Sequence, residues 1–377
     1  MPTINGILQT LKSENRLRTI PEEPATDMLD LSSNDYLSLG ASFREFTKEF
    51  TDRFPDAAFS SSASRLLSTR QNYHLRLEDM LQRLYGRPAL LFNSGYHANV
   101  GCIGALSLPS TLFVCDKLIH ASVIDGLRIN GAEFKRFPHN DATKLENIVE
   151  KESEKYERIV VVAESIYSMD GDEAPIDKLV ELKRRFSNVI LYVDEAHAFG
   201  VRGEKGLGVA EEIGLTEDID IIVGTFGKAA ASAGAFAVAS PEMKSLLINL
   251  SRPFIFSTAL PPANIAWTIL MLEKILDMGD ARKHLAEISR TFTERINKIA
   301  REESPSTSQI IPFMTGDAAK ALKIASRLRE SGIIALPIRR PTVPPGGERI
   351  RFSLGAGMET TQFERVFKVL EEAANEV

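Results

Sequence analysis

The chain has 377 residues, of which 44% are hydrophobic and 25% are charged, and its formal net charge is −6. These values are typical of a folded protein with one large or two ordinary domains, and they exclude a fibrous repeat or a disordered chain. The acidic balance offers no broad surface for nucleic acid, so any phosphate must bind at a local site. Its two cysteines are too few for a disulfide framework, and no stretch reaches the roughly 20 apolar residues of a membrane span. We therefore expect a cytoplasmic protein that binds neither nucleic acid nor membrane.

In chain order, residues 1–40 predict an N-terminal arm, residues 41–260 a large α/β domain, and residues 261–377 a linker helix followed by a small α+β domain. Within the large domain, short apolar runs alternate with helical periodicity, which favours a mostly parallel sheet buried on both faces. Seven strands are predicted, at 89–92, 111–115, 133–137, 158–163, 189–193, 219–223 and 235–239. Helices are predicted between them, at 72–85, 96–107, 119–130, 143–153 and 175–187.

The small domain begins after a helix predicted over residues 265–276, and it includes strands near 310–313 and 349–353. Ligands of open α/β sheets bind outside the carboxyl ends of the strands. The polar residues that follow the predicted strands of the large domain are therefore the first candidates for a site.

Four or five strand ends deliver carboxylates, imidazoles, hydroxyls and one amine to that edge of the sheet. The amine is Lys228, the carboxylate is Asp194, and the imidazoles are His120 and His197. Taken singly, each of these residues is more often a cap, a loop residue or a solvated charge. Their joint placement at one sheet edge favours a catalytic site.

These groups match the needs of pyridoxal 5′-phosphate (PLP). An amine binds the aldehyde, a carboxylate keeps the pyridine nitrogen protonated, and a flat side chain covers the ring. Lys228, Asp194 and His120 are predicted for these three roles, and His197 can reach the ring hydroxyl. The phosphate needs N–H groups at a helix N-terminus and hydroxyl groups. The sequence offers these groups at Gly95, Tyr96, Thr225 and Ser168.

Two other interpretations concern the same segment. Asp194-Glu195-Ala196-His197 spells the acidic box of a helicase-type ATPase, but that function needs a Gly-x-x-x-x-Gly-Lys-Ser/Thr loop, which is absent. A zinc site from Asp194, His197 and His120 would lack both the His-Glu-x-x-His motif and paired cysteines, and no metal is predicted.

From about residue 29 onward, the chain resembles the α-oxoamine synthases, a family of fold-type-I PLP enzymes. The resemblance is carried by the motifs around Asn34, His120, Asp194, Lys228 and Arg351, together with the segment 164–171, in the family's order. It implies a transferase of the aminotransferase class I/II fold, which condenses an amino acid with an acyl thioester and releases CO2. It also implies a homodimer with shared active sites.

The same resemblance extends the list of site residues. Asn34 and Arg351 are expected to hold the amino-acid carboxylate. The segment containing Ser64 is expected to line the site of the neighbouring subunit, and Ser257 and Thr258 to reach that subunit's phosphate. Arg18, Arg339 and Thr342 are further substrate candidates, with Arg16 as an alternative to Arg18.

Three segments, 138–141, 225–228 and 340–344, are most similar to family members that join L-alanine to a pimeloyl thioester in biotin biosynthesis. The acyl carrier would be coenzyme A or a carrier protein. The alternatives are a glycine-using member, which takes acetyl, succinyl or another acyl thioester, and a non-catalytic partner subunit that has lost the cofactor. The presence of Lys228, Asp194, His197 and His120 argues against the non-catalytic subunit.

Overall fold

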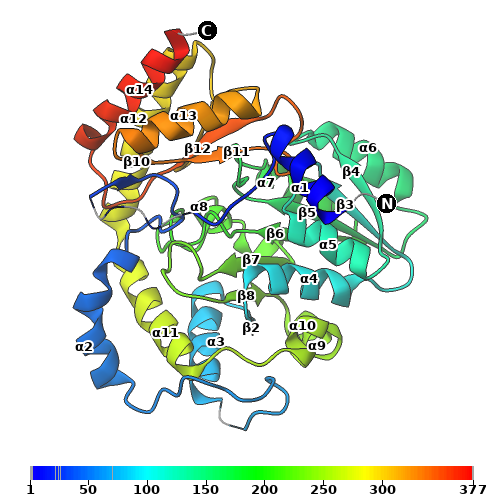
Figure 1. Cartoon of the computed structure of the whole chain (residues 1–377). Helices are drawn as coiled ribbons and strands as arrows, with labels where there is room; N and C mark the ends of the chain where they lie inside the picture. Colours follow the sequence, from blue (N-terminus) through cyan, green and yellow to red (C-terminus); the bar gives the residue numbers. More distant parts are fainter. Residues whose placement is uncertain (1–2, 22, 24, 26, 70, 376–377) are drawn as a thin grey trace. The chain divides into compact units, whose positions relative to one another are not determined.

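The computed structural model describes residues 3–21, 23, 25, 27–69 and 71–375. Its contacts divide the chain into two compact units. The sheet unit comprises Leu37–Tyr167 and Glu173–Arg282, and the C-terminal unit comprises Met1–Tyr36, Ser168–Asp172 and Lys283–Val377. Figure 1 shows the elements of each unit coloured along the sequence. Among the described helices, none is both long and apolar enough to cross a membrane.

The sheet unit contains the predicted seven-stranded sheet, with the strand order β2-β8-β7-β6-β5-β3-β4. Only β8 runs antiparallel to its neighbours, so the other six strands end at the same edge. The strands are β2 (Ala89–Phe92), β3 (Thr111–Asp116), β4 (Glu133–Phe137), β5 (Arg158–Glu164), β6 (Val189–Asp194), β7 (Ile221–Thr225) and β8 (Ala235–Val238). The mostly parallel sheet predicted from the sequence is confirmed.

Helices cover this sheet because its central strands are apolar on both faces. On one face, α4 and α5 contribute Ala98, Cys102 and Val123 to a core shared with Val162 and Tyr192 of the strands. The helices of this unit are α2 (Phe43–Arg53), α3 (Asn72–Tyr85), α4 (Gly95–Leu106), α5 (Ala121–Ile129), α6 (Ala142–Glu152), α7 (Ile176–Arg185), α8 (Val209–Glu212), α9 (Pro241–Leu250), α10 (Arg252–Phe256) and α11 (Pro262–Leu276). Helix α3 coincides with the predicted helix and ends at Gly86, whose φ of 70° suits a glycine C-cap.

The C-terminal unit has a three-stranded antiparallel sheet with the order β11-β12-β9, and a parallel pair of β1 with β10. Helix α13 packs against β10, β11, β12 and α14. Its elements are α1 (Ile4–Ser13), β1 (Leu29–Asp30), α12 (Gly279–Ala300, in this unit from Lys283), β9 (Ile310–Met314), α13 (Ala318–Glu330), β10 (Ile333–Ile334), β11 (Leu336–Ile338), β12 (Arg349–Ser353) and α14 (Glu364–Asn375). This unit contains the α+β elements predicted for the small domain, but its bounds differ from the predicted 261–377: the predicted linker helix, α11, belongs to the sheet unit, and residues 1–36 and 168–172 belong to this one.

Candidate functional site

The carboxyl edge of the large sheet brings several candidate residues to neighbouring strands. Asp194 is the last residue of β6, Glu164 is the last residue of β5, and the two are paired in register. Thr225 ends β7, and Lys228 follows it in the next turn. Because these strands are parallel, their ends place a carboxylate, a carboxyl, a hydroxyl and an amine at one edge.

Asp194 is held by donors on both of its oxygens. It is only 5% exposed. Its Oδ2 accepts a hydrogen bond of 2.8 Å from Asn99 Nδ2, and its Oδ1 accepts one of 2.9 Å from the Ala196 backbone N–H. His197, three residues further along the chain, is also buried. These two hydrogen bonds hold the Asp194 side chain in one orientation at the sheet edge, where it can face a cationic ring nitrogen.

His120 is fixed at the start of α5, where its ring caps the helix. Nδ1 accepts a hydrogen bond of 3.2 Å from the Ser122 backbone N–H and lies 2.7 Å from Ser122 Oγ. Desolvation is the largest influence on the ring and lowers the pKa of His120, and the charge of Lys228 lowers it further, against the opposing effect of Asp194. A neutral imidazole is therefore the form expected near pH 7.

Glu164 was not among the predicted site residues. Its side chain is 3% exposed, and its Oε1 has no hydrogen-bond partner within the described chain. Burial, followed by the charge of Asp194, raises the pKa of Glu164 well above its usual value. The carboxyl group of Glu164 is therefore expected to be neutral at physiological pH.

The phosphate candidates lie around the start of α4. Ser94 caps this helix by accepting a hydrogen bond from the His97 N–H, and the first N–H groups, on Gly95 and Tyr96, have no acceptor within the helix. A Cβ on Gly95 would lie 3.9 Å from Thr225 Oγ1, so the hydroxyl and the helix start are neighbours. Thr225 itself is fixed by a hydrogen bond of 3.0 Å to the Gly234 carbonyl.

The remaining predicted residues of the sheet unit surround the same helix start or lie on loops. Thr258 accepts a hydrogen bond of 2.7 Å from Asn93, the residue before the Ser94 cap, through its backbone carbonyl. Ser257 is half-buried beside it. Ser64 is buried in another loop, and the Tyr96 ring is 45% exposed with its hydroxyl bonded to Asp125.

In the C-terminal unit, Arg351 and Asn34 are brought together as expected. Arg351 is 4% exposed, and its guanidinium donates to the Ser168 carbonyl at 2.6 Å and to Asn34 Oδ1 at 3.2 Å. A third bond of 3.3 Å reaches Ser353 Oγ. Within the described ranges, none of these partners is a carboxylate. A buried guanidinium with only neutral acceptors favours binding of an anion.

Arg18, Arg339 and Thr342 form a second cluster in the same unit. Arg18 donates to Thr342 Oγ1 at 2.8 Å, and Arg339 donates to the Asn15 carbonyl at 2.6 Å. Partial burial, followed by the charge of Arg18, lowers the pKa of Arg339, which indicates that the two guanidinium groups lie near each other. Like charges held together in this way favour an anionic ligand.

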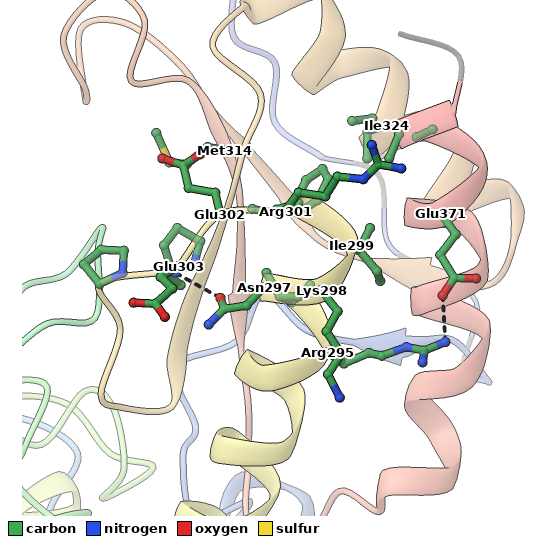
Figure 2. A pocket seen from close by; sticks show the side chains of 18 of the residues that line it. Arg295, Asn297, Lys298, Ile299, Arg301, Glu302, Glu303, Met314, Ile324 and Glu371 are labelled. Carbon is green, nitrogen blue, oxygen red and sulfur yellow. Dashed lines mark hydrogen bonds and ion pairs between the residues drawn. The ribbon is translucent and has the colours of Figure 1, made fainter.

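A cavity of about 770 Å³ in the C-terminal unit contains none of the predicted residues (Figure 2). The end of α12 lines it with β9, α13 and α14, and charges of both signs surround it, including the Arg295–Glu371 pair at 2.6 Å. A cavity lined in this way favours neither an anion nor a cation. We do not assign it to the candidate site.

The residues of the sheet unit fit PLP. The amine of Lys228, the Asp194 carboxylate with its two hydrogen bonds, the ring of His120 and the N–H groups at the start of α4 are the kinds of group that can hold the aldehyde, the ring nitrogen, the ring face and the phosphate of the cofactor. Across the described ranges, no group of three His, Cys, Asp or Glu side chains is arranged to hold a metal.

Comparisons with known proteins agree with this arrangement. A family model for aminotransferase class I and II matches residues 26–370. A Pasteurella multocida protein is 46% identical, with 97% of this chain and 98% of that protein covered. A Haemophilus influenzae protein is 44% identical, with 94% and 97% covered. Both carry the provisional name 8-amino-7-oxononanoate synthase.

Solved structures extend the comparison. The serine palmitoyltransferase of Sphingomonas wittichii has a TM-score of 0.87 at 28% identity, with 99% of this chain and 96% of that chain covered. A serine palmitoyltransferase from S. paucimobilis, solved with a PLP adduct, has a TM-score of 0.88 at 26% identity, with 99% and 97% covered. The 8-amino-7-oxononanoate synthase of Francisella tularensis shares the fold, with a TM-score of 0.78 at 24% identity and 93% and 98% covered.

The chain therefore belongs to the aminotransferase class I and II family, in its α-oxoamine synthase branch. It has the fold-type-I architecture, it uses PLP, and it is an acyl-transferring enzyme. These predictions from the sequence are confirmed.

Proposed function

We propose that this enzyme condenses L-alanine with a pimeloyl thioester, releasing CO2 and the free thiol carrier to give 8-amino-7-oxononanoate. The relatives that carry this provisional name, at 44–46% identity over most of the chain, support the choice. The observation that carries a dicarboxylic acyl chain is the Arg18–Arg339–Thr342 cluster, because a pimeloyl chain, like a succinyl chain, ends in a free carboxylate, whereas acetyl and palmitoyl chains do not.

When PLP is bound, it supplies an electron sink for the charge that develops at the α-carbon of the amino acid. Lys228 would bind the cofactor covalently through Nζ and then, once released, take the α-proton of alanine at the same atom. Asp194 would keep a proton on the ring nitrogen, and His120 would lie against the ring. His197 and Ser168 would contact its hydroxyl, and Gly95, Tyr96 and Thr225 its phosphate, with Ser257 and Thr258 acting across a subunit boundary.

The substrate groups would be held in the C-terminal unit. Arg351 and Asn34 would bind the α-carboxylate of alanine, since a planar guanidinium suits a planar carboxylate. Arg18 and Arg339 would bind the distal carboxylate of the pimeloyl chain, and Thr342 would fix Arg18 by their bond of 2.8 Å. Binding both ends of the reactants would lower the entropic part of the barrier.

We expect the highest kcat/KM with L-alanine and a pimeloyl thioester among matched pairs that combine alanine, glycine or L-serine with pimeloyl, succinyl, acetyl or palmitoyl thioesters. Arg18→Ala should raise KM for the pimeloyl thioester about tenfold or more, because a charge-assisted contact is lost, and leave KM for alanine within about twofold. The methyl ester of the pimeloyl chain should show no such dependence on Arg18. A preference for glycine with a short acyl chain, or for L-serine with palmitoyl, would reject the proposal.

Large apolar side chains on the sheet unit support a homodimer. Phe59 is 87% exposed, Leu67 78%, Phe256 69% and Ile129 68% in the single chain. Apolar side chains of this size that remain exposed in one subunit commonly mark an interface. Light scattering should therefore give a molar mass twice that of one chain. Leu67→Glu should lower the measured mass toward that of one chain and should lower the activity as well. A fully active monomer would contradict shared active sites.

A further inference from the structure

Two buried polar side chains, Asn99 and Ser122, connect Asp194 to His120 through a continuous chain of hydrogen bonds, and Tyr192 joins this chain at Asn99. Tyr192 Oη donates to Asn99 Oδ1 at 2.6 Å. Asn99 Nδ2 then donates both to Asp194 Oδ2 at 2.8 Å and to Ser122 Oγ at 2.9 Å. Ser122 Oγ lies 2.7 Å from His120 Nδ1. The carboxylate and the imidazole of the candidate site therefore share one amide.

The donor and the acceptor of each hydrogen bond in this chain can be assigned by starting from the Tyr192 hydroxyl. Burial raises the pKa of Tyr192 well above its usual value, so its hydroxyl keeps its proton and donates to the Asn99 oxygen. The amide nitrogen must then face Asp194 and Ser122, which uses both of its N–H groups. Ser122 accepts one of them, which leaves its own proton for His120 Nδ1. That nitrogen also accepts the Ser122 backbone N–H, so the ring carries its proton on Nε2.

We propose that Asn99 is a positioning residue, which holds the Asp194 carboxylate and, through Ser122, the His120 ring in one orientation before PLP binds. Asn99 is 2% exposed, and the other buried residues of its helix are apolar. Burial of its amide therefore costs desolvation free energy, which its hydrogen bonds offset. A carboxylate turned away from the ring nitrogen would stabilise its charge less. This inference rests on the proposed roles of Asp194 and His120.

A double-mutant cycle on PLP affinity tests the first half of the proposal. Asn99→Leu keeps the side-chain shape and removes both donors, and we expect PLP to bind about tenfold or more weakly by equilibrium dialysis. In an Asp194→Asn background, the same change should alter affinity less than about twofold, because the carboxylate that it holds is already gone. Additive losses would mean that Asn99 acts only on the fold, and would overturn the proposal.

The matched control is Asn188→Leu. Asn188 Nδ2 also donates two bonds, each of 2.9 Å, but to the carbonyls of Ser153 and Tyr156. This variant should lose stability, measured by thermal unfolding, while its affinity for PLP stays within about twofold of the wild-type value. A loss of affinity as large as that of Asn99→Leu would assign both effects to general destabilisation. If the wild-type chain binds no PLP, the proposed function fails before the cycle is measured.

Titration of His120 in the cofactor-free protein tests the second half, and it decides the proposal if Asn99→Leu does not fold. A bond donated to Nδ1 stabilises the neutral imidazole, so Ser122→Ala should raise the pKa of His120 and increase the share of the Nδ1-H tautomer in ¹⁵N NMR spectra. Ser240→Ala removes a comparable helix cap from Met243 and should leave both readouts unchanged. An unchanged His120 in Ser122→Ala would overturn the proposed link to the ring.

Discussion

Replacement of Lys228 by alanine is expected to abolish turnover, with a loss of at least about 10⁴-fold, because one amine is proposed both to bind PLP and to move the α-proton. Lys228 is half-buried at the end of β7, and its charge influences His120 and Glu164. Release of the thiol carrier from the pimeloyl thioester measures turnover. Borohydride reduction of the wild-type protein, followed by peptide mass analysis, should locate the cofactor on Lys228.

Lys228→Arg distinguishes the positive charge of Lys228 from its ability to form an imine and to accept a proton. A guanidinium keeps the positive charge near Asp194 but stays protonated and forms no imine, so this variant should be as inactive as Lys228→Ala. Lys178→Ala removes an exposed lysine that pairs with Glu181 at 3.1 Å, and should retain full activity. Turnover near the wild-type rate in Lys228→Arg, or reduction that labels another lysine, would refute the assignment.

The sequence predicted the sheet because its central strands consist of continuous apolar runs, which only burial on both faces explains. All seven strands formed, and α3 matched its predicted range. Strand β7 begins two residues later than predicted and extends through Thr225, because Gly224 and Thr225 pair with Phe236 and Ala235 of β8. This antiparallel pairing partner lies ten residues along the chain, so local hydrophobicity could not reveal where β7 ends.

The polar residues behind the site were less predictable. Asn99 lies in a helix that the sequence marks as small and apolar, and Ser122 and Glu164 lie within recognised motifs without an assigned role. Their importance comes from partners on other elements, such as Tyr192 on β6. One sign was present in the sequence, since a lone amide among apolar residues of a buried helix needs hydrogen-bond partners. The identity of those partners depends on the tertiary fold.

Asp194→Asn is expected to lower the rate of α-proton removal about 10³-fold, because a neutral amide cannot stabilise the charge that develops on the bound cofactor. The exchange of the alanine α-proton for deuterium, followed by NMR, measures this step without the thioester. The substitution also places a hydrogen-bond donor where the neighbouring groups are donors. Both present partners of Asp194, the Asn99 amide and the Ala196 N–H, are donors, so an amide at this position must turn its own NH2 toward one of them.

Asp220→Asn is the matched control for the loss of a charged hydrogen-bond acceptor. Asp220 Oδ2 accepts the Leu191 N–H at 2.7 Å at the opposite end of the neighbouring strands, so an amide there also loses a charged acceptor from the sheet. Its α-proton exchange should remain near the wild-type rate although its unfolding temperature falls. With Asp194 neutral, one influence that raises the pKa of Glu164 disappears, so that pKa should fall. If Asp194→Asn exchanges the α-proton at a near-normal rate and the double variant with Glu164→Gln does not, the electrostatic role belongs to Glu164. If the double variant also exchanges at a near-normal rate, neither carboxyl group takes part in the mechanism.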